Sequence, residues 1–271
     1  MTTAVDELDD GLDYQVDYSS DGGETVPVEI EETKVKEDTE EQPKKRKRTN
    51  EKLVNKKKMK MEQDVEEKQK LATATPEIIA DFLASRIRKQ NKDLSALELG
   101  ELYLSKTVFK GTGDFDKPRT PENLSSFLNE FLERFIPVEK KKKAKKSKTS
   151  KEETKKYIVV VSMSALRACD IYRATKALPN SSLKIINKNK LQADLDILRK
   201  TDSRILAGTP GRMLKVLSHE DPPISSTEIA CIVCDSSYLD SKKQTVWEIP
   251  ETIEFLRKVT GENPNAKVYL Y

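Results

Sequence analysis

The chain has 271 residues, a length that accommodates one or two domains. Hydrophobic residues make up 36% and charged residues 35%, so part of the chain lacks the apolar side chains for a core. Three cysteines are too few for a disulfide scaffold, no apolar run approaches the roughly 20 residues that span a bilayer, and the acidic N-terminus is unlike a signal peptide. We therefore expect an intracellular protein without membrane contact.

Residues 1–70 are predicted to form a disordered tail, because they carry charge blocks without apolar periodicity. Residues 1–41 hold 15 acidic and 2 basic residues, whereas residues 43–60 hold 10 basic and 1 acidic residue. The acidic half is either a solubilising tail or an arm that engages basic proteins. The basic cluster has the form of a nuclear-localisation signal, and such clusters also attract nucleic acid. Its candidate residues are Lys44, Lys45, Arg46, Lys47 and Arg48.

Residues 75–137 are predicted to form a helical segment that packs on the domain after it, because their apolar residues keep helical spacing. Thr-Pro pairs that begin at Thr75 and Thr120 place a capping residue before a proline at the start of two helices. Residues 138–156 contain ten lysines and are predicted to be a surface loop. Such a run is either solvated or in contact with nucleic-acid backbone.

From Tyr157 onward, short apolar runs alternate with helical stretches, which is typical of a doubly wound α/β domain. The predicted strands are Tyr157–Val161, Leu183–Asn187, Arg204–Ala207, Ile229–Cys234 and Lys267–Leu270. The predicted helices lie near residues 163–178, 189–200, 210–218 and 250–260. The strands lack strict polar alternation, as parallel strands covered on both faces do. We therefore expect a mostly parallel sheet of five or six strands.

The segment Thr209–Arg212 is the strongest candidate for a binding site. It follows a buried strand and begins a short amphipathic helix, and open α/β sheets place ligands beyond the carboxyl ends of their strands. Thr209 is expected to cap this helix and Pro210 fits its first turn, while Gly211 admits a ligand close to the backbone. Free N–H groups and the Arg212 guanidinium would then bind a phosphate. The alternative is a purely structural role, since Thr-Pro also starts two other helices.

This segment resembles the TPGR motif of DEAD-box RNA helicases, and the resemblance extends over residues 157–271. Met163–Ala168 stands in place of the PTRELA motif, and Lys188 and Asn189 replace the paired glycines. The resemblance implies a RecA-like domain, and we expect RNA backbone or a ribosomal protein to dock onto its TPGR edge. The residues expected to bind RNA or phosphate are Thr209, Pro210, Gly211, Arg212, Lys188 and Lys190.

The elements that would make such a domain an ATPase are missing. No GxxxxGK[ST] sequence occurs, and the nearest stretch, Gly111–Thr120, has the wrong spacing and a proline after Lys117. Asp235 matches the aspartate that would hold Mg²⁺, but the glutamate expected after it is Ser236. We also expect no second RecA-like domain, since the sequence ends at Tyr271. We therefore expect no catalytic residues, cofactor, metal or small-molecule substrate; a divergent nucleotide-binding enzyme is the alternative.

The remaining metal-ligand residue types are weak candidates. Cys231 and Cys234 form a CxxC pair, but no second pair completes a zinc site. Residues i and i+3 of a strand point to opposite faces, so both thiols are predicted to be buried structural residues. His219 is the single histidine and has no nucleophile partner in the sequence.

The whole layout is similar to the Cms family of small-subunit pre-ribosome factors, which are helicase-like proteins without helicase motifs. The resemblance covers about residues 75–271 and rests on the charged tail, on LELGELY at 97–103, on FDKPRTPENL at 115–124 and on the TPGR element. It implies a non-enzymatic assembly factor of the early 90S particle, or small-subunit processome, in the nucleus and nucleolus. Implied partners are pre-ribosomal RNA, the box C/D guide RNA particle and ribosome assembly proteins; a nuclear adaptor that binds basic proteins through the acidic tail is the alternative.

Overall fold

The computed structural model describes residues 44–136, 155–178 and 182–271, with side chains from Asn55 onward. The chain divides into two units, residues 1–49 and 50–271, and the fold below is that of the second. The acidic half of the predicted tail and most of the predicted lysine-rich loop lie outside the described residues.

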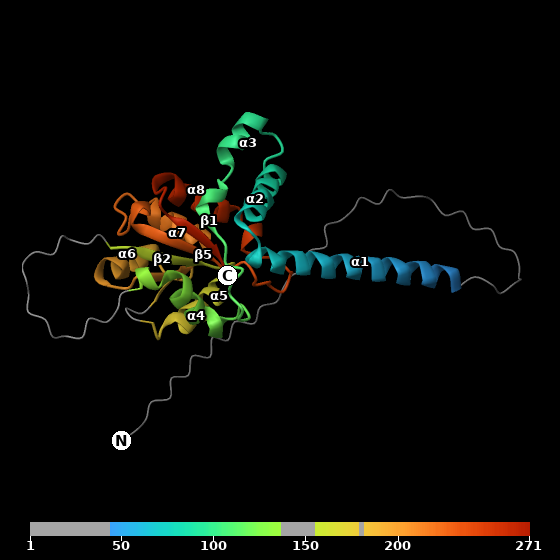
Figure 1. Cartoon of the computed structure of the whole chain (residues 1–271), viewed down its shortest axis with the longest axis horizontal. Coiled ribbons are helices and arrows are strands. Elements are labelled where there is room, and N and C mark those ends of the chain that lie inside the picture. The colour runs from blue at the N-terminus through green and yellow to red at the C-terminus, as the bar shows by residue number, and fades with distance from the viewer. Residues whose placement is uncertain (1–43, 137–154, 179–181) are drawn as a thin grey trace, which may run out of the picture. The chain divides into compact units, whose positions relative to one another are not determined.

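Six strands of the described chain form one parallel sheet in the order β1-β6-β5-β2-β4-β3 (Figure 1). Their bounds are β1 Phe109–Lys110, β2 Tyr157–Val161, β3 Leu183–Ile185, β4 Ile205–Gly208, β5 Ile229–Cys234 and β6 Lys267–Leu270. All five predicted strands are present, and β1 is an additional strand at one edge. The predicted α/β fold with a mostly parallel sheet of five or six strands is confirmed.

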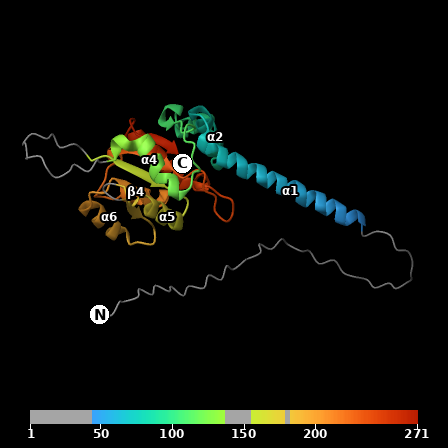
Figure 2. The same cartoon turned by 60° about the horizontal axis from the view of Figure 1, so that its bottom comes forward.

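Helices cover both faces of this sheet (Figures 1 and 2). Their bounds are α1 Lys44–Lys70, α2 Pro76–Gln90, α3 Ala96–Leu102, α4 Pro121–Leu132, α5 Ala165–Thr175, α6 Leu191–Lys200, α7 Pro210–Leu217 and α8 Pro250–Glu262. Short 3₁₀ turns lie at Leu71–Thr73, Lys106–Val108, Glu133–Phe135, Ser226–Glu228 and Val246–Glu248. Apolar residues of α4 and α5 pack on one face, and those of α2, α6, α7 and α8 pack on the other.

Strand β5 shows how one apolar run serves two cores. Ile232 and Cys234 belong to the cluster beneath α7 and α8, whereas Cys231 and Val233 belong to the cluster beneath α4 and α5. The two cysteines are therefore buried on opposite faces, as predicted. Burial raises the pKa of the Cys231 thiol to about 12, so this group stays protonated at neutral pH.

The segment 75–137 is more than a helical layer on the domain. Its strand β1 pairs with β6, with Phe109 opposite Val268, and its helix α4 supplies one wall of a core. The predicted boundary at Tyr157 therefore separates parts of one sheet. Two residues of β1 carry no readable period, which is why the sequence pattern missed this strand.

Within the predicted tail, residues 44–70 form the helix α1. Lysine, glutamate and methionine are good helix formers, and opposite charges four residues apart support a helix without an apolar face. Such pairs join Lys58 to Glu62, Asp64 to Lys68 and Glu66 to Lys70. The predicted nuclear-localisation residues 44–48 lie at the start of this helix, and their role stays a prediction.

The three Thr-Pro pairs do start helices, since α2, α4 and α7 begin at Pro76, Pro121 and Pro210. The threonine side chains, however, make no cap hydrogen bond in any of the three. What the three helix starts share is a proline at the first helical position, whose fixed φ angle suits a helix. Thr75, Thr120 and Thr209 thus occupy the predicted N-cap positions without the side-chain bond of a cap.

Candidate functional site at the carboxyl edge of the sheet

Three central strands end side by side and bring the candidate segments together. Strand β2 pairs with β4 up to Val161 opposite Gly208, and with β5 up to Val161 opposite Cys234. The segments that follow these strands contain Ser164, Thr209 and Asp235. The structure therefore places the TPGR segment and the DEAD-like position at one edge, where open α/β sheets hold ligands.

Arg212, expected to bind a phosphate, is instead buried in an ion pair. Its side chain is about 6% exposed, and Nε and Nη2 lie 2.8 and 2.7 Å from Oδ2 of Asp194 on α6. Nη2 also donates to the carbonyl oxygen of Asn189 at 2.7 Å. A phosphate would have to displace a carboxylate that is only 1% exposed. The guanidinium is thus committed inside the molecule.

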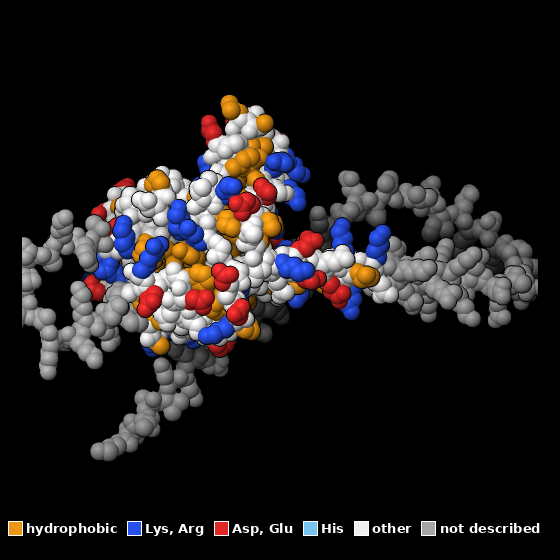
Figure 3. Space-filling view, viewed as in Figure 1, with side chains coloured by type: hydrophobic (Ala, Val, Ile, Leu, Met, Phe, Trp, Pro, Cys, Tyr) orange, Lys and Arg blue, Asp and Glu red, His pale blue; other side chains and the backbone are white. Residues whose placement is uncertain are grey.

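This ion pair holds the turn that carries the predicted lysines. Asn189 donates from Nδ2 to the second oxygen of Asp194 at 2.8 Å, so both carboxylate oxygens are engaged. The turn between β3 and α6 is thereby tied to α7 through Arg212. Lys188 and Lys190 flank Asn189 and are exposed. Lys and Arg side chains gather over α6 and α7 in the space-filling view (Figure 3).

The N-terminus of α7 is crowded rather than open. Pro210 is buried, and the hydroxyl oxygen of Thr209 is buried without a hydrogen-bond partner among the described residues. A Cβ on Gly211 would lie 3.6 Å from the Glu251 carboxylate oxygen Oε1, so an acidic group already stands beside this turn. Gly208 is needed for packing, because a Cβ there would lie 2.5 Å from the carbonyl oxygen of Ile185.

A second buried ion pair engages Asp235, the residue that was aligned with the Mg²⁺-binding aspartate of the helicases. Arg167 on α5 donates from Nε to Oδ2 of Asp235 at 2.6 Å and from Nη2 to Oδ1 at 3.1 Å. Burial would lower the pKa of Arg167, but its bonds with Asp235 outweigh that effect and raise the pKa. The guanidinium also lies 4.4 Å from the ring centre of Tyr238. Both oxygens that would face Mg²⁺ therefore accept hydrogen bonds from one arginine.

Ser236, which the resemblance to DEAD-box helicases aligns with a glutamate, is a structural residue. It is fully buried, and its hydroxyl accepts a hydrogen bond from Nε1 of Trp247 at 2.8 Å. Its backbone N–H donates to the carbonyl oxygen of Tyr271 at 2.7 Å. These bonds join the end of β5 to the residue after β6 and to the 3₁₀ turn before α8.

The connection from β1 to α4 contains Gly111–Thr120, the stretch of the sequence nearest to a P-loop. Within it, Arg119 donates to the carbonyl oxygens of Leu270 and Thr112 at 2.7 and 2.6 Å. Its guanidinium also faces the rings of Phe115, Phe127 and Tyr271 at 5.7–5.9 Å. Burial lowers the pKa of Arg119. The Arg119 side chain and these rings thus occupy the space inside the β1–α4 connection.

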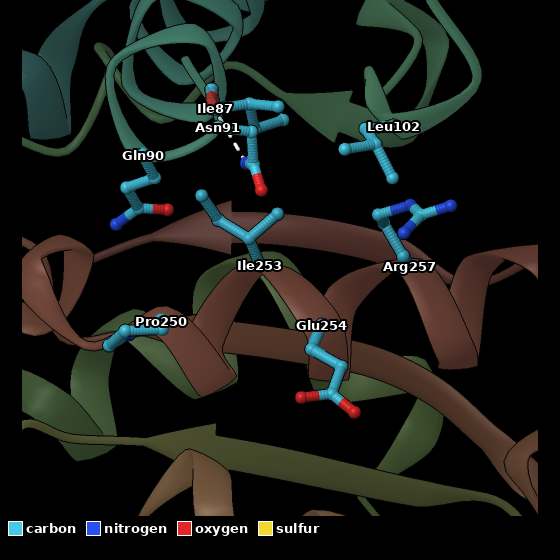
Figure 4. Close-up of a pocket in the computed structure, with 8 residues that line it drawn as sticks. All are labelled: Ile87, Gln90, Asn91, Leu102, Pro250, Ile253, Glu254 and Arg257. Atoms are coloured by element: carbon cyan, nitrogen blue, oxygen red, sulfur yellow. Dashed lines mark hydrogen bonds between the residues drawn. The ribbon is translucent and has the colours of Figure 1, made fainter. Parts of the chain in front are cut away.

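A separate hollow of about 420 Å³ lies between the α2–α3 pair and α8 (Figure 4). Ile253 points toward Ile87 across it, and Asn91 donates back to the Ile87 carbonyl oxygen. Arg257 at its rim donates to the carbonyl oxygen of Glu101. These contacts make the hollow a seam between packed helices. The described part of the chain holds no cluster of three metal-ligand side chains and no helix that could span a membrane.

A profile described as CMS1, U3-containing 90S pre-ribosomal complex subunit, matches residues 28–267. The chain belongs to the CMS1 family. The predicted family is thereby confirmed, and CMS1 membership assigns the chain to ribosome biogenesis as a pre-ribosomal complex subunit.

Three fungal CMS1 proteins are similar to the chain. Protein CMS1 of Chaetomium thermophilum is 30% identical over 187 residues, which cover 68% of this chain and 70% of the relative. Protein CMS1 of Saccharomyces cerevisiae is 30% identical over 222 residues, with 76% and 69% covered. Protein cms1 of Schizosaccharomyces pombe is 26% identical over 282 aligned positions, with 96% and 93% covered. The similarity thus extends across most of each protein.

Proposed function

We propose that the chain is a non-enzymatic subunit of the early small-subunit pre-ribosome that holds RNA backbone at the carboxyl edge of its sheet. The observation that carries this proposal is the burial of two arginines in ion pairs at that edge. Arg212 and Arg167 are each committed to a buried aspartate, so the edge is closed internally. Among the basic groups that it presents to solvent are Lys188 and Lys190, on the turn that Arg212 holds. Phosphate contacts of this kind position a molecule without reading its sequence.

The absence of enzymatic activity is part of the proposal. Phosphoryl transfer needs a backbone cradle with a lysine for the phosphates, and an aspartate that holds Mg²⁺. Here Asp235 is bonded to Arg167 through both oxygens, and Arg119 lies in the β1–α4 connection. Both features support a domain with a helicase-like fold that forms no ATP site.

We further propose that Lys44–Arg48 direct nuclear import and that the chain acts in the nucleolus. The partners would be pre-ribosomal RNA, the box C/D guide RNA particle and neighbouring assembly proteins. Membership in a family of U3-containing 90S complex subunits supports this location and these partners.

The chain is expected to show no saturable binding of Mg²⁺–ATP. The single tryptophan offers a direct readout, because Trp247 is bonded to Ser236 beside Asp235. Tryptophan fluorescence and calorimetry of the full chain should both stay flat as nucleotide is added. Saturable binding by either method would overturn the non-enzymatic assignment and favour a divergent nucleotide-binding enzyme.

Replacing Lys188 and Lys190 together by serine is expected to weaken binding to single-stranded RNA and to flatten its salt dependence. Each phosphate contact on a single strand contributes about 0.7 to the slope of log affinity against log salt, so the slope should fall by about 1.4. The matched control is the Lys89→Ser, Lys92→Ser variant, which removes two exposed lysines at the end of α2. An equal loss in both variants would indicate non-specific attraction, and the carboxyl-edge proposal would fail.

A further inference from the structure

A pocket lies at the opposite, amino edge of the sheet. Its volume is about 390 Å³, within the roughly 300–1,000 Å³ of small-ligand sites. Its lining residues are Arg134, Phe135, Lys156, Ala230, Asn263 and Asn265. Lys156 immediately precedes β2, Ala230 is the second residue of β5, and Asn265 precedes β6. The pocket is therefore built from the starts of three neighbouring strands and from the turn after α4.

The aromatic wall of this pocket carries an arginine. Phe135 is half-buried against the core beneath α4 and α5, and Cζ of Arg134 lies 4.5 Å from its ring centre. Burial raises the pKa of Tyr269, and the nearby Arg134 guanidinium opposes that shift. The ring of Phe135 thus supports an exposed, planar, charged group at the pocket mouth.

The opposite wall is polar and held in place by backbone bonds. Asn263 donates to the carbonyl oxygens of Thr227 and Ile229 at 3.2 and 2.9 Å, and accepts from the backbone N–H of Asn265 at 3.1 Å. These bonds fix the turn that carries the exposed amide of Asn265. Lys156 is exposed and donates to the Thr227 carbonyl oxygen at 3.1 Å, which keeps its ammonium group at the rim.

We propose that this pocket binds one nucleotide of a single-stranded RNA segment. The base would stack on the outer face of the Arg134 guanidinium, which Phe135 supports from behind, and Asn265 would hydrogen-bond the base edge. Lys156 would neutralise the adjoining phosphate. None of the six lining residues described is acidic, so the pocket favours an anion.

RNA fits this chemistry better than an acidic protein segment does. A carboxylate would use the charge of Arg134 and Lys156 but not the flat face that the Arg134–Phe135 stack presents. In the sequence, the stretch between Phe135 and Lys156 is rich in lysine. Membership in a family of pre-ribosomal complex subunits gives a further reason to expect RNA as the ligand. This site is separate from the carboxyl edge, and either proposal can fail without the other.

The test uses the full chain, a short fluorescent oligouridylate and a short RNA duplex. Arg134→Lys keeps the charge but removes the planar stacking surface, so affinity for the single strand should fall about tenfold, the loss of one base stack, while affinity for the duplex is unchanged. Phe135→Leu should act in the same direction, because it removes the ring that supports Arg134. Arg173→Lys, an exposed arginine on α5, is the matched control and should bind as the parent does.

Three outcomes would overturn the proposal. The first is an Arg134→Lys variant that retains single-strand affinity. The second is an equal loss on single strand and duplex, which would show that the pocket supplies charge alone. The third is displacement of the pocket-bound probe by an acidic peptide as effectively as by RNA, which would indicate a protein partner. Unfolding midpoints equal to that of the parent show that each variant is folded, and thiouridine crosslinks on the Arg134–Phe135 peptide would support the assignment independently.

Discussion

Replacing Asp235 by asparagine is expected to lower the free energy of unfolding by about 3–5 kcal/mol, the cost of leaving one partner of a buried ion pair uncompensated. The Arg167 side chain is only 8% exposed, and it donates one hydrogen bond to each oxygen of the Asp235 carboxylate. Asparagine keeps the shape of the side chain but removes its charge. Urea unfolding of the full chain, followed by the fluorescence of Trp247, measures the change.

The matched control for this variant removes both charges. Arg167→Met with Asp235→Leu leaves no buried charge uncompensated, so it should recover most of the stability lost in Asp235→Asn. A stable Asp235→Asn protein would show that water or another group reaches Arg167. In that case the carboxyl edge would be more open than the hydrogen bonds indicate, and an ion at Asp235 would again be conceivable.

Arg212→Ala is expected to cost a similar 3–5 kcal/mol, since it leaves the buried Asp194 carboxylate without its cation. It also removes the bond to the Asn189 carbonyl oxygen, which fixes the turn that presents Lys188 and Lys190. RNA affinity should therefore fall through a loosened turn, and the salt slope should change less than in the double lysine variant. Hydrogen exchange of residues 186–190 measures the loosening directly.

The control for Arg212 is again a charge-free pair, Arg212→Met with Asp194→Leu. Stability should return in this variant, and the turn should stay loose because Asn189 has lost its side-chain bond to Asp194 and the bond that its carbonyl oxygen accepts from Arg212. If Arg212→Ala instead reduces the salt slope by a full phosphate contact while stability is unchanged, Arg212 touches RNA directly. The simpler expectation from the TPGR sequence would then be correct.

The fold could be predicted further than the site. Dense apolar runs predict the strands of the α/β domain, and the helical spacing of apolar residues predicts its helices. The order of these elements along the chain and their boundaries could therefore be predicted to within a few residues. Strand β1 could not be found, because two residues carry no period. Helix α1 was missed because its stability comes from charge pairs rather than from an apolar face.

The state of the arginines was not visible in their own motifs. Arg212 and Asp194 are 18 positions apart, and Arg167 and Asp235 are 68 apart, so only the fold brings each pair together. A signal was nevertheless present in α6, where Asp194 shares its helix face with the buried Leu195 and Leu198. A carboxylate on an apolar face needs a buried partner, and such a partner would be an arginine.

The pairing of β1 with β6 has a consequence for the order in which the protein folds. Phe109 lies opposite Val268, and Arg119 and Thr120 bond Leu270 and Tyr271 across 151 positions of sequence. Closing so long a loop is a slow entropic step. During synthesis β1 has no sheet partner until β6 leaves the ribosome. The edge that holds Arg119 is therefore assembled last, when the rest of the sheet has already formed.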